Sequence, residues 1–246
     1  MLQEQVDWYE SWFGSPYYRI LYQDRDIEEA RKFIVNLIEY LQPLPGSTMA
    51  DIACGEGRYA IQLAKYGYDV TGIDLAYESI QKAKKHEADN LHFLVHDMRF
   101  PFYINYFDYA FNFFTSFGYF NSERDHNMAA KSFARCLKKG GLLVIDYINK
   151  ENALANMVAE DVVERGNFTF HINKKLEQNH FIKHIRFNDE NGAERLFTET
   201  VAAFTLSDFL TMFKGVGLAP VATFGDYRLN SYNPQESPRM IMIFKK

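Results

Sequence analysis

Cysteine is scarce in this chain of 246 residues, which contains only Cys54 and Cys136. Two cysteines so far apart match neither the paired spacing of a zinc site nor the framework of a disulfide-rich domain. No cluster of Asp, Glu and His has metal-ligand spacing, and the histidines at 171, 180 and 184 alternate with apolar residues as on one face of a strand. We therefore expect no metal.

An excess of positive charge is also lacking, because 27 Lys and Arg stand against 32 Asp and Glu, which gives a net charge of −5. Such a chain has no overall basic footprint to attract phosphate backbones or acidic lipids. The most apolar stretch, residues 107–120, is too short and too interrupted by polar residues to span a bilayer. The N-terminal residues show no basic segment followed by an apolar one. We expect a cytoplasmic protein without a nucleic-acid or membrane partner.

Aromatic residues are abundant, at 16% of the chain, with 22 Phe and 16 Tyr. Hydrophobic residues at 47% and charged residues at 24% are typical of a folded globular protein. The length suits one domain that carries an insertion.

Residues 1–46 are expected to form a helical lid. Asp26 and Glu29 have the spacing of a capping box, and apolar residues then recur at helical period until Pro43. The segment before this helix is crowded with aromatic residues, namely Trp8, Tyr9, Trp12, Phe13, Tyr17, Tyr18 and Tyr22.

Residues 47–149 alternate short apolar strands with helices. The expected strands are 48–54, 68–73, 91–96, 108–114 and 142–147, and the expected helices are 57–66, 76–86 and 122–138. Ser122 would cap the last helix, and Lys138, Lys139 and Gly140 would close it. This alternation predicts an α/β fold with a doubly wound, mostly parallel sheet and a ligand at the carboxyl ends of its strands.

The alternation stops over residues 150–203, where we expect an antiparallel β insertion on the substrate side of the site. Polar and apolar residues alternate over 168–176, 180–187 and 195–204, with turn residues at 188–192. Residues 204–246 then return to the main sheet, with a helix over 207–216 and strands near 219–224 and 239–245.

Residues 51–60 join the first strand to the first helix through Gly55 and Gly57, which would let a ligand approach the backbone near the helix N–H groups. Asp74 closes the second strand, where a carboxylate can accept both hydroxyls of a ribose. Asp97 follows the third strand and could meet the amine of a base. The glycine segment also fits the weak dinucleotide fingerprint G-x-G-x-x-[GA], so a tight turn without ligand and an NAD-dependent dehydrogenase remain alternatives.

Taken in order, these motifs resemble those of class I S-adenosylmethionine-dependent methyltransferases of the small-molecule type. The four motifs stand at residues 51–57, 70–74, 96–98 and 107–113, and Ala53 replaces a glycine of the first. The resemblance covers residues of about 27–150 and the end of the chain, and it implies a Rossmann-like seven-stranded sheet. A dehydrogenase would need neither Asp51 nor the segment 96–98.

The resemblance also implies a cofactor site for S-adenosylmethionine at the strand ends. Asp74 would hold the ribose, and Leu75 would flank the adenine. The other residues implied at the cofactor are Ala53, Cys54 and Gly55 for its methionine part, Asp97 and Met98 for the adenine, and Asn112 and Phe113 for the amino group and the sulfonium. From the lid, the candidates for its carboxylate or for the substrate pocket are Tyr17, Tyr18, Tyr22 and Arg25.

The acceptor would lie in an aromatic-lined cavity beyond the fourth and fifth strands. Its expected walls are Phe114, Ser116, Phe117, Tyr119, Phe120, Tyr147 and a lid tyrosine. Tyr147 and Tyr119 are the candidates for a catalytic base, although a phenol with an ordinary pKa near 10 is a poor base at neutral pH. A further group could form an anion-binding side or a solvated hairpin, namely Tyr227, Arg228, Tyr232 and Arg239.

We expect methyl transfer from S-adenosylmethionine to a small molecule by in-line displacement, with S-adenosylhomocysteine as product. Two alternatives remain, a non-catalytic S-adenosylmethionine-binding module and a methyltransferase that acts on a protein or tRNA. The acidic charge and the lack of an appended binding domain disfavour the latter. The sequence specifies neither the acceptor nor the methylated atom (N, O, C or S), and it allows a homodimer without requiring one.

Overall fold

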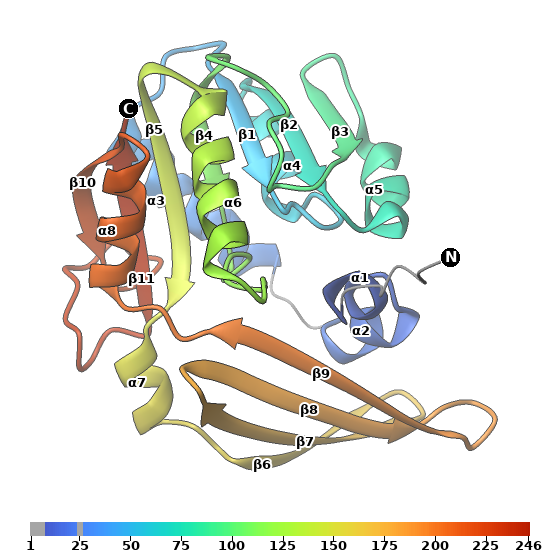
Figure 1. Ribbon diagram of the computed structural model, residues 1–246. Coiled ribbons are helices and arrows are strands. Elements are labelled where there is room, and N and C mark those ends of the chain that lie inside the picture. Colours follow the sequence, from blue (N-terminus) through green and yellow to red (C-terminus); the bar gives the residue numbers. More distant parts are fainter. Residues whose placement is uncertain (1–7, 24–26) are drawn as a thin grey trace, which may run out of the picture.

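The computed structural model describes residues 8–23 and 27–246, in which two β-sheets enclose a pair of short helices (Figure 1). The larger sheet has seven strands in the order β10-β11-β5-β4-β1-β2-β3. They are β1 (Thr48–Ile52), β2 (Asp69–Asp74), β3 (Leu91–Val95), β4 (Phe107–Asn112), β5 (Leu137–Ile148), β10 (Ala219–Phe224) and β11 (Arg239–Lys245). Strands β1 to β5 run parallel, whereas β11 is antiparallel to both of its neighbours, β5 and β10. The predicted doubly wound, mostly parallel sheet is therefore confirmed.

Helices cover both faces of this sheet. Helices α3 (Ile27–Leu41), α4 (Arg58–Lys65) and α5 (Tyr77–Ala83) share one apolar cluster with it, and α6 (Glu123–Cys136) and α8 (Leu206–Gly215) share the other. A 3-10 helix, η1 (Lys84–His86), follows α5. Because both faces are packed, the central strands are mostly apolar, as expected for a parallel sheet, although they carry the buried polar residues Asp51, Asn112 and Asp146.

The smaller sheet has four antiparallel strands in the order β6-β7-β8-β9. They are β6 (Glu160–Arg165), β7 (Phe168–Glu177), β8 (His180–Asn188) and β9 (Glu194–Ala202), and the helix α7 (Lys150–Ala155) leads into them. The sequence predicted three of these strands but neither α7 nor β6. The edge strand β6 has few apolar residues, and its strand conformation depends on pairing with β7.

One predicted helix end is wrong. Helix α6 begins after Ser122, whose hydroxyl accepts the N–H of Asp125, as expected for its cap. However, it ends at Cys136, and residues 138–140 belong to β5 instead of closing the helix. Leu137 already has an extended backbone and pairs with Phe107 of β4, so the pairing between strands overrides the local helix-ending signal.

Helices α1 (Trp8–Phe13) and α2 (Pro16–Leu21) lie between the carboxyl edge of the main sheet and the smaller sheet (Figure 1). Trp12 of α1 and Leu21 of α2 are buried in one apolar cluster with Phe170, Ile172 and Ile185 of the smaller sheet. The smaller sheet therefore packs against the N-terminal helices on the side that faces away from the main sheet. Within the described residues, no helix combines the length and apolarity required to cross a membrane.

Candidate functional site

The turn between β1 and α4 is built from left-handed backbone conformations. Ala53, Gly55 and Gly57 have φ angles of 60°, 56° and 83°. This region favours glycine, so Ala53 holds a strained conformation of the kind that accumulates at functional sites. The carboxylate of Asp51, which is 1% exposed, accepts the N–H of Ala60 at 3.0 Å and ties the turn to the first turn of α4.

The two glycines of this turn have different roles. A Cβ atom at Gly55 would meet nothing within 4 Å, so space is open above its backbone. A Cβ atom at Gly57 would lie 2.6 Å from the Phe93 ring. Only Gly55 thus provides the close approach that the sequence predicted for both, while Gly57 is required for packing.

Asp74 stands at the end of β2 and faces the same turn. Its Oδ2 accepts the N–H of Gly55 at 2.8 Å, and its Oδ1 accepts the N–H of Ala76 at 2.8 Å. Burial raises its pKa, although these backbone N–H groups favour the charged form. Each carboxylate oxygen can accept a second hydrogen bond, so the side chain still has acceptor capacity for a ligand diol.

A cavity of about 550 Å³ opens at these strand ends and reaches the N-terminal helices. It includes seven of the residues predicted at the cofactor, namely Tyr18, Tyr22, Ala53, Cys54, Gly55, Asp74 and Phe113. It also includes Phe114, Ser116 and Tyr119, which were predicted to line the acceptor pocket. Phe13, one of the aromatic residues of the lid, lines it too, and further lining residues that the sequence did not single out include Arg19, Arg58, Tyr59 and Gln62.

Four predicted cofactor residues do not line this cavity. Leu75 and Met98 are half-buried and pack against the main core. Asp97 binds the guanidinium of Arg99 at 2.7 Å, so an adenine amine would have to share this carboxylate. Asn112 is fully buried and donates from Nδ2 to the carbonyl of Ile52, whereas its Oδ1 has no partner. Arg25, also predicted at the cofactor, lies outside the described residues.

Several expected acceptor residues belong to the core instead. Phe117 and Phe120 are buried, and Tyr147 is 0% exposed. The Tyr147 hydroxyl donates to the carbonyl of Ala202, and burial raises its pKa. This corrects the expectation that Tyr147 lines the acceptor cavity, because a buried, committed hydroxyl cannot receive a proton there. Tyr119 does line the cavity, but its hydroxyl donates to the carbonyl of Thr115 at 2.6 Å.

Some of the residues expected in the lid and in the anion-binding group also bind other protein side chains and do not face the cavity. Tyr17 donates its hydroxyl to Glu190 at 2.7 Å and does not line the cavity. Tyr227 and Arg239 both bind the buried carboxylate of Asp146, so they stabilise the structure instead of forming an open anion site. Arg228 and Tyr232 do not line the cavity either.

Arg19 is the functional candidate that sequence reasoning missed. It lines the cavity from α2, and its Nη1 is buried without a hydrogen-bond partner. The sequence contained one sign of this role. Arg19 stands three residues before Tyr22, a spacing that places both side chains on the same side of a helical turn. A buried guanidinium nitrogen without an acceptor would suit an anionic group of a ligand.

The unpartnered nitrogen of Arg19 fits the carboxylate of an amino-acid moiety. The unpaired Oδ1 of Asn112 is fully buried and does not line the cavity. Asp74 and the open backbone at Gly55 complement a ribose next to that moiety. Across residues 8–23 and 27–246, no three His, Cys, Asp or Glu side chains are grouped so as to hold a metal ion.

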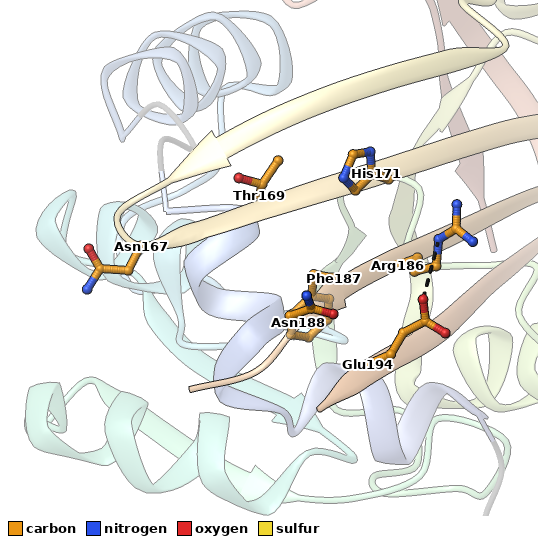
Figure 2. A pocket seen from close by; sticks show the side chains of 7 residues that line it. All are labelled: Asn167, Thr169, His171, Arg186, Phe187, Asn188 and Glu194. Atoms are coloured by element: carbon orange, nitrogen blue, oxygen red, sulfur yellow. Dashed lines mark ion pairs between the residues drawn. The ribbon is translucent and has the colours of Figure 1, made fainter. Parts of the chain in front are cut away.

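A second hollow, of about 460 Å³, lies on the smaller sheet and is lined by Asn167, Thr169, His171, Arg186, Phe187, Asn188 and Glu194 (Figure 2). Arg186 and Glu194 form an ion pair across it at 4.0 Å, and their side chains are 61% and 68% exposed. Such an exposed ion pair contributes little to the stability of the fold. None of the buried polar atoms that lack a partner belongs to these residues.

The comparisons with known proteins point to one chemistry. Residues 49–141 match the family model described as a methyltransferase domain. The chain is 36% identical over 99 residues to the methyltransferase YqeM of Bacillus subtilis, which covers 39% of this chain and 40% of that protein. It is 25% identical over 193 residues to the dTDP-3-amino-3,4,6-trideoxy-alpha-D-glucopyranose N,N-dimethyltransferase of Streptomyces venezuelae, which covers 75% of this chain and 80% of that protein.

A solved structure resembles nearly the whole chain. An S-adenosylmethionine-dependent methyltransferase from Clostridium acetobutylicum superimposes with a TM-score of 0.77 at 17% identity and covers 93% of this chain and 95% of that one. At this identity the likeness concerns the fold, and it includes both the main sheet and the insertion.

Proposed function

We propose that this chain is an S-adenosylmethionine-dependent methyltransferase that methylates a small molecule held beside the cofactor at the strand ends, as its methyltransferase-domain match and its fold support. One observation carries the proposal. A single cavity is lined both by motif residues such as Gly55 and Asp74 and by the aromatic side chains Phe114 and Tyr119 beyond β4. Its volume of about 550 Å³ lies within the usual range for small-molecule sites.

Three residues of this chain would hold the cofactor. Asp74 would accept the ribose hydroxyls, and the open backbone of Gly55 would lie against the ligand. Arg19 would pair with the carboxylate. When bound, S-adenosylmethionine supplies an electrophilic methyl group on a sulfonium.

Aromatic faces at the end of β4 suit a cationic centre. The Arg58 guanidinium already lies 4.4 Å over the Tyr59 ring and 5.3 Å from the centroid of the Phe114 ring, and all three residues line the cavity. The negative face of an aromatic ring attracts a positive charge that transfer would neutralise. The main contribution of the protein would be to hold the acceptor in line with the methyl group, which can by itself supply much of the rate enhancement.

The lid argues for a small acceptor. Helices α1 and α2 lie between the strand ends and the smaller sheet (Figure 1), and Phe13, Tyr18 and Tyr22 line the cavity from this side. A protein side chain or a tRNA base would have to pass this cover. The Streptomyces venezuelae relative is named as an N,N-dimethyltransferase of an amino sugar, so an amine is the acceptor group we propose first.

The test has two parts. Calorimetry should show that S-adenosylhomocysteine binds and NAD does not. A product assay for S-adenosylhomocysteine should then show turnover with a small amine or hydroxyl acceptor, starting with dTDP-3-amino-3,4,6-trideoxyglucose and simple catechols. Binding without turnover on any small molecule, together with turnover on bulk tRNA or protein, would overturn the proposal.

A further inference from the structure

The smaller sheet lies close to the site without lining it. None of the described residues that line the cavity belongs to this sheet, although all of residues 150–203 are described. Helices α1 and α2 lie between the sheet and the strand ends (Figure 1), and the lid lines the cavity through Phe13, Tyr18, Arg19, Tyr22 and Gln23. Any effect of the smaller sheet on the site therefore passes through the lid.

The lid helices depend on contacts with the rest of the protein. Helices α1 and α2 have six residues each. An isolated helix needs roughly 12–15 residues to be even marginally stable in water. Trp12 and Leu21 pack into the apolar cluster of the smaller sheet. Because apolar burial is not directional, directional hydrogen bonds are needed to fix the side chains that face the cavity.

One carboxylate supplies such hydrogen bonds to both ends of the lid. Glu199 of β9 accepts the indole N–H of Trp12 on Oε1 at 2.6 Å. It also accepts the hydroxyl of Tyr22, which lies 2.7 Å from Oε1 and 3.0 Å from Oε2. Trp12 directly precedes the lining residue Phe13, and Tyr22 lines the cavity with the rest of its side chain. The two hydrogen bonds thus bracket the segment that carries Arg19.

A cation stabilises this carboxylate in a mostly buried position. The side chains of Lys183 and Glu199 are 20% and 16% exposed and form an ion pair at 3.6 Å. The Lys183 ammonium group also donates to the Tyr22 hydroxyl oxygen. Hydrogen bonds to an ionised carboxylate in such surroundings are stronger than those between neutral groups. Glu199 therefore attaches the lid to the smaller sheet by charge-assisted hydrogen bonds.

We propose that Glu199 is a positioning residue of the cofactor site, which holds Arg19 over the ligand by fixing both ends of the lid. This inference rests on the proposed function. Arg19 stands between Trp12 and Tyr22 in the chain, and its unpartnered Nη1 is the group that suits the cofactor carboxylate. Loss of either hydrogen bond to Glu199 would let this guanidinium move away from the carboxylate. The smaller sheet thereby raises the affinity for the cofactor from a residue that does not line the cavity.

The first test compares S-adenosylhomocysteine with 5′-methylthioadenosine, which lacks the carboxylate. Calorimetry should show that Glu199→Met raises the Kd for S-adenosylhomocysteine about tenfold and the Kd for 5′-methylthioadenosine less than about threefold. Glu199→Gln keeps an acceptor oxygen for Trp12 and Tyr22, so it should bind S-adenosylhomocysteine within about threefold of the wild type. Tyr22→Phe removes one of the two hydrogen bonds and should show a smaller loss with the same ligand preference. A general loss of stability would weaken both ligands alike.

A double variant and a matched control isolate the route through Arg19. Arg19→Met/Glu199→Met should lose no more affinity for S-adenosylhomocysteine than Arg19→Met alone, because both substitutions remove the same contact with the carboxylate. The control is Glu190→Met, which removes the acceptor of the Tyr17 hydroxyl. This second tyrosine–carboxylate pair of the lid is exposed, and Tyr17 does not line the cavity. Glu190→Met should therefore leave both Kd values unchanged.

The second test follows the lid directly. Both tryptophans of the chain, Trp8 and Trp12, belong to α1, so the intrinsic tryptophan fluorescence reports on the lid alone. Trp12 is 1% exposed when it is bound to Glu199. Acrylamide should therefore quench the fluorescence more strongly in Glu199→Met than in the wild type or in Glu190→Met.

The outcomes separate this inference from the proposed function. Failure of the wild type to bind S-adenosylhomocysteine would overturn the proposed function itself. Binding by the wild type together with an unaffected Glu199→Met variant would overturn the positioning role alone. Equal losses for the two ligands, or equal losses in Glu199→Gln and Glu199→Met, would overturn it as well.

Discussion

Asp146 and Arg239 form a buried ion pair directly behind the cavity wall, with the Arg239 Nε 2.7 Å from Asp146 Oδ1. The other oxygen of Asp146 accepts the N–H of Phe114 at 2.8 Å, and Arg239 donates to the hydroxyl of Thr115 at 3.0 Å. Phe114 and Thr115 have φ angles of 57° and 58°. The pair thus holds two consecutive residues in a conformation that side chains rarely adopt.

Asp146→Asn should therefore destabilise the protein by about 3 kcal/mol, because it leaves a mostly buried guanidinium without its counter-charge. Urea denaturation of the folded variant measures this loss. The control is Glu194→Gln, which removes one partner of the exposed pair in Figure 2 and should change the free energy of unfolding by less than about 1 kcal/mol. Equal effects of the two substitutions would contradict the anchoring role of Asp146.

Asp74→Ala should raise the Kd for S-adenosylhomocysteine at least about 100-fold. The carboxylate would make two hydrogen bonds to a ribose diol, each worth about 1.5–3 kcal/mol when charge-assisted, and it also holds the Gly55 N–H. Calorimetry measures the change, and Asp69→Ala at the opposite end of the same strand is the control. Unchanged affinity in a folded Asp74→Ala variant would remove Asp74 from the site, and tight NAD binding would restore the dehydrogenase alternative.

Arg19→Met should weaken S-adenosylhomocysteine binding by about tenfold or more, the loss of one charge-assisted hydrogen bond. The same variant should bind 5′-methylthioadenosine, which lacks the carboxylate, as well as the wild type does. Competition binding with the two ligands measures the ratio of their Kd values in the variant and in the wild type. Arg31→Met, which removes an exposed arginine paired with Glu28, should affect neither ligand. Equal losses for both ligands would place Arg19 away from the carboxylate.

The buried carboxylate of Asp51 predicts a pH dependence of stability. Burial raises its pKa from 3.8 to about 7. Because the native state then binds the proton more tightly than the unfolded state does, this residue favours folding below about pH 4, and its contribution falls as the pH rises to about 7. Asp51→Asn keeps an acceptor for the Ala60 N–H but removes this titration.

The variant should therefore match the wild type near pH 4 and exceed its stability by up to about 4 kcal/mol at pH 8, at 1.36 kcal/mol per unit of pKa. Denaturant unfolding across this range measures the difference between the two proteins. Parallel curves for wild type and variant would show that Asp51 stays ionised in the native state throughout.

The sequence by itself determined the main sheet and the core of the proposed cofactor site. Strands β1 to β4 and helices α3 to α5 follow from local apolar periods and glycine turns, because these signals lie within a few residues of one another. Gly55 and Asp74 meet for the same reason. Gly55 lies in the turn that follows β1, Asp74 ends the adjacent parallel strand β2, and the carboxyl ends of such strands face one edge.

Only the tertiary structure decided which side chains surround the cavity. Tyr22 and Glu199 are 177 positions apart, and no local pattern shows that the lid and the second sheet bring them together. Its position near a strand end predicted that Tyr147 would line the acceptor cavity. In the structure it is buried, and its hydroxyl donates to the carbonyl of Ala202, which lies 55 positions further along the chain. Arg19 became a candidate because the fold leaves its Nη1 buried without a partner. Such contacts depend on how distant elements pack, so the sequence gives the residues and the fold decides their partners.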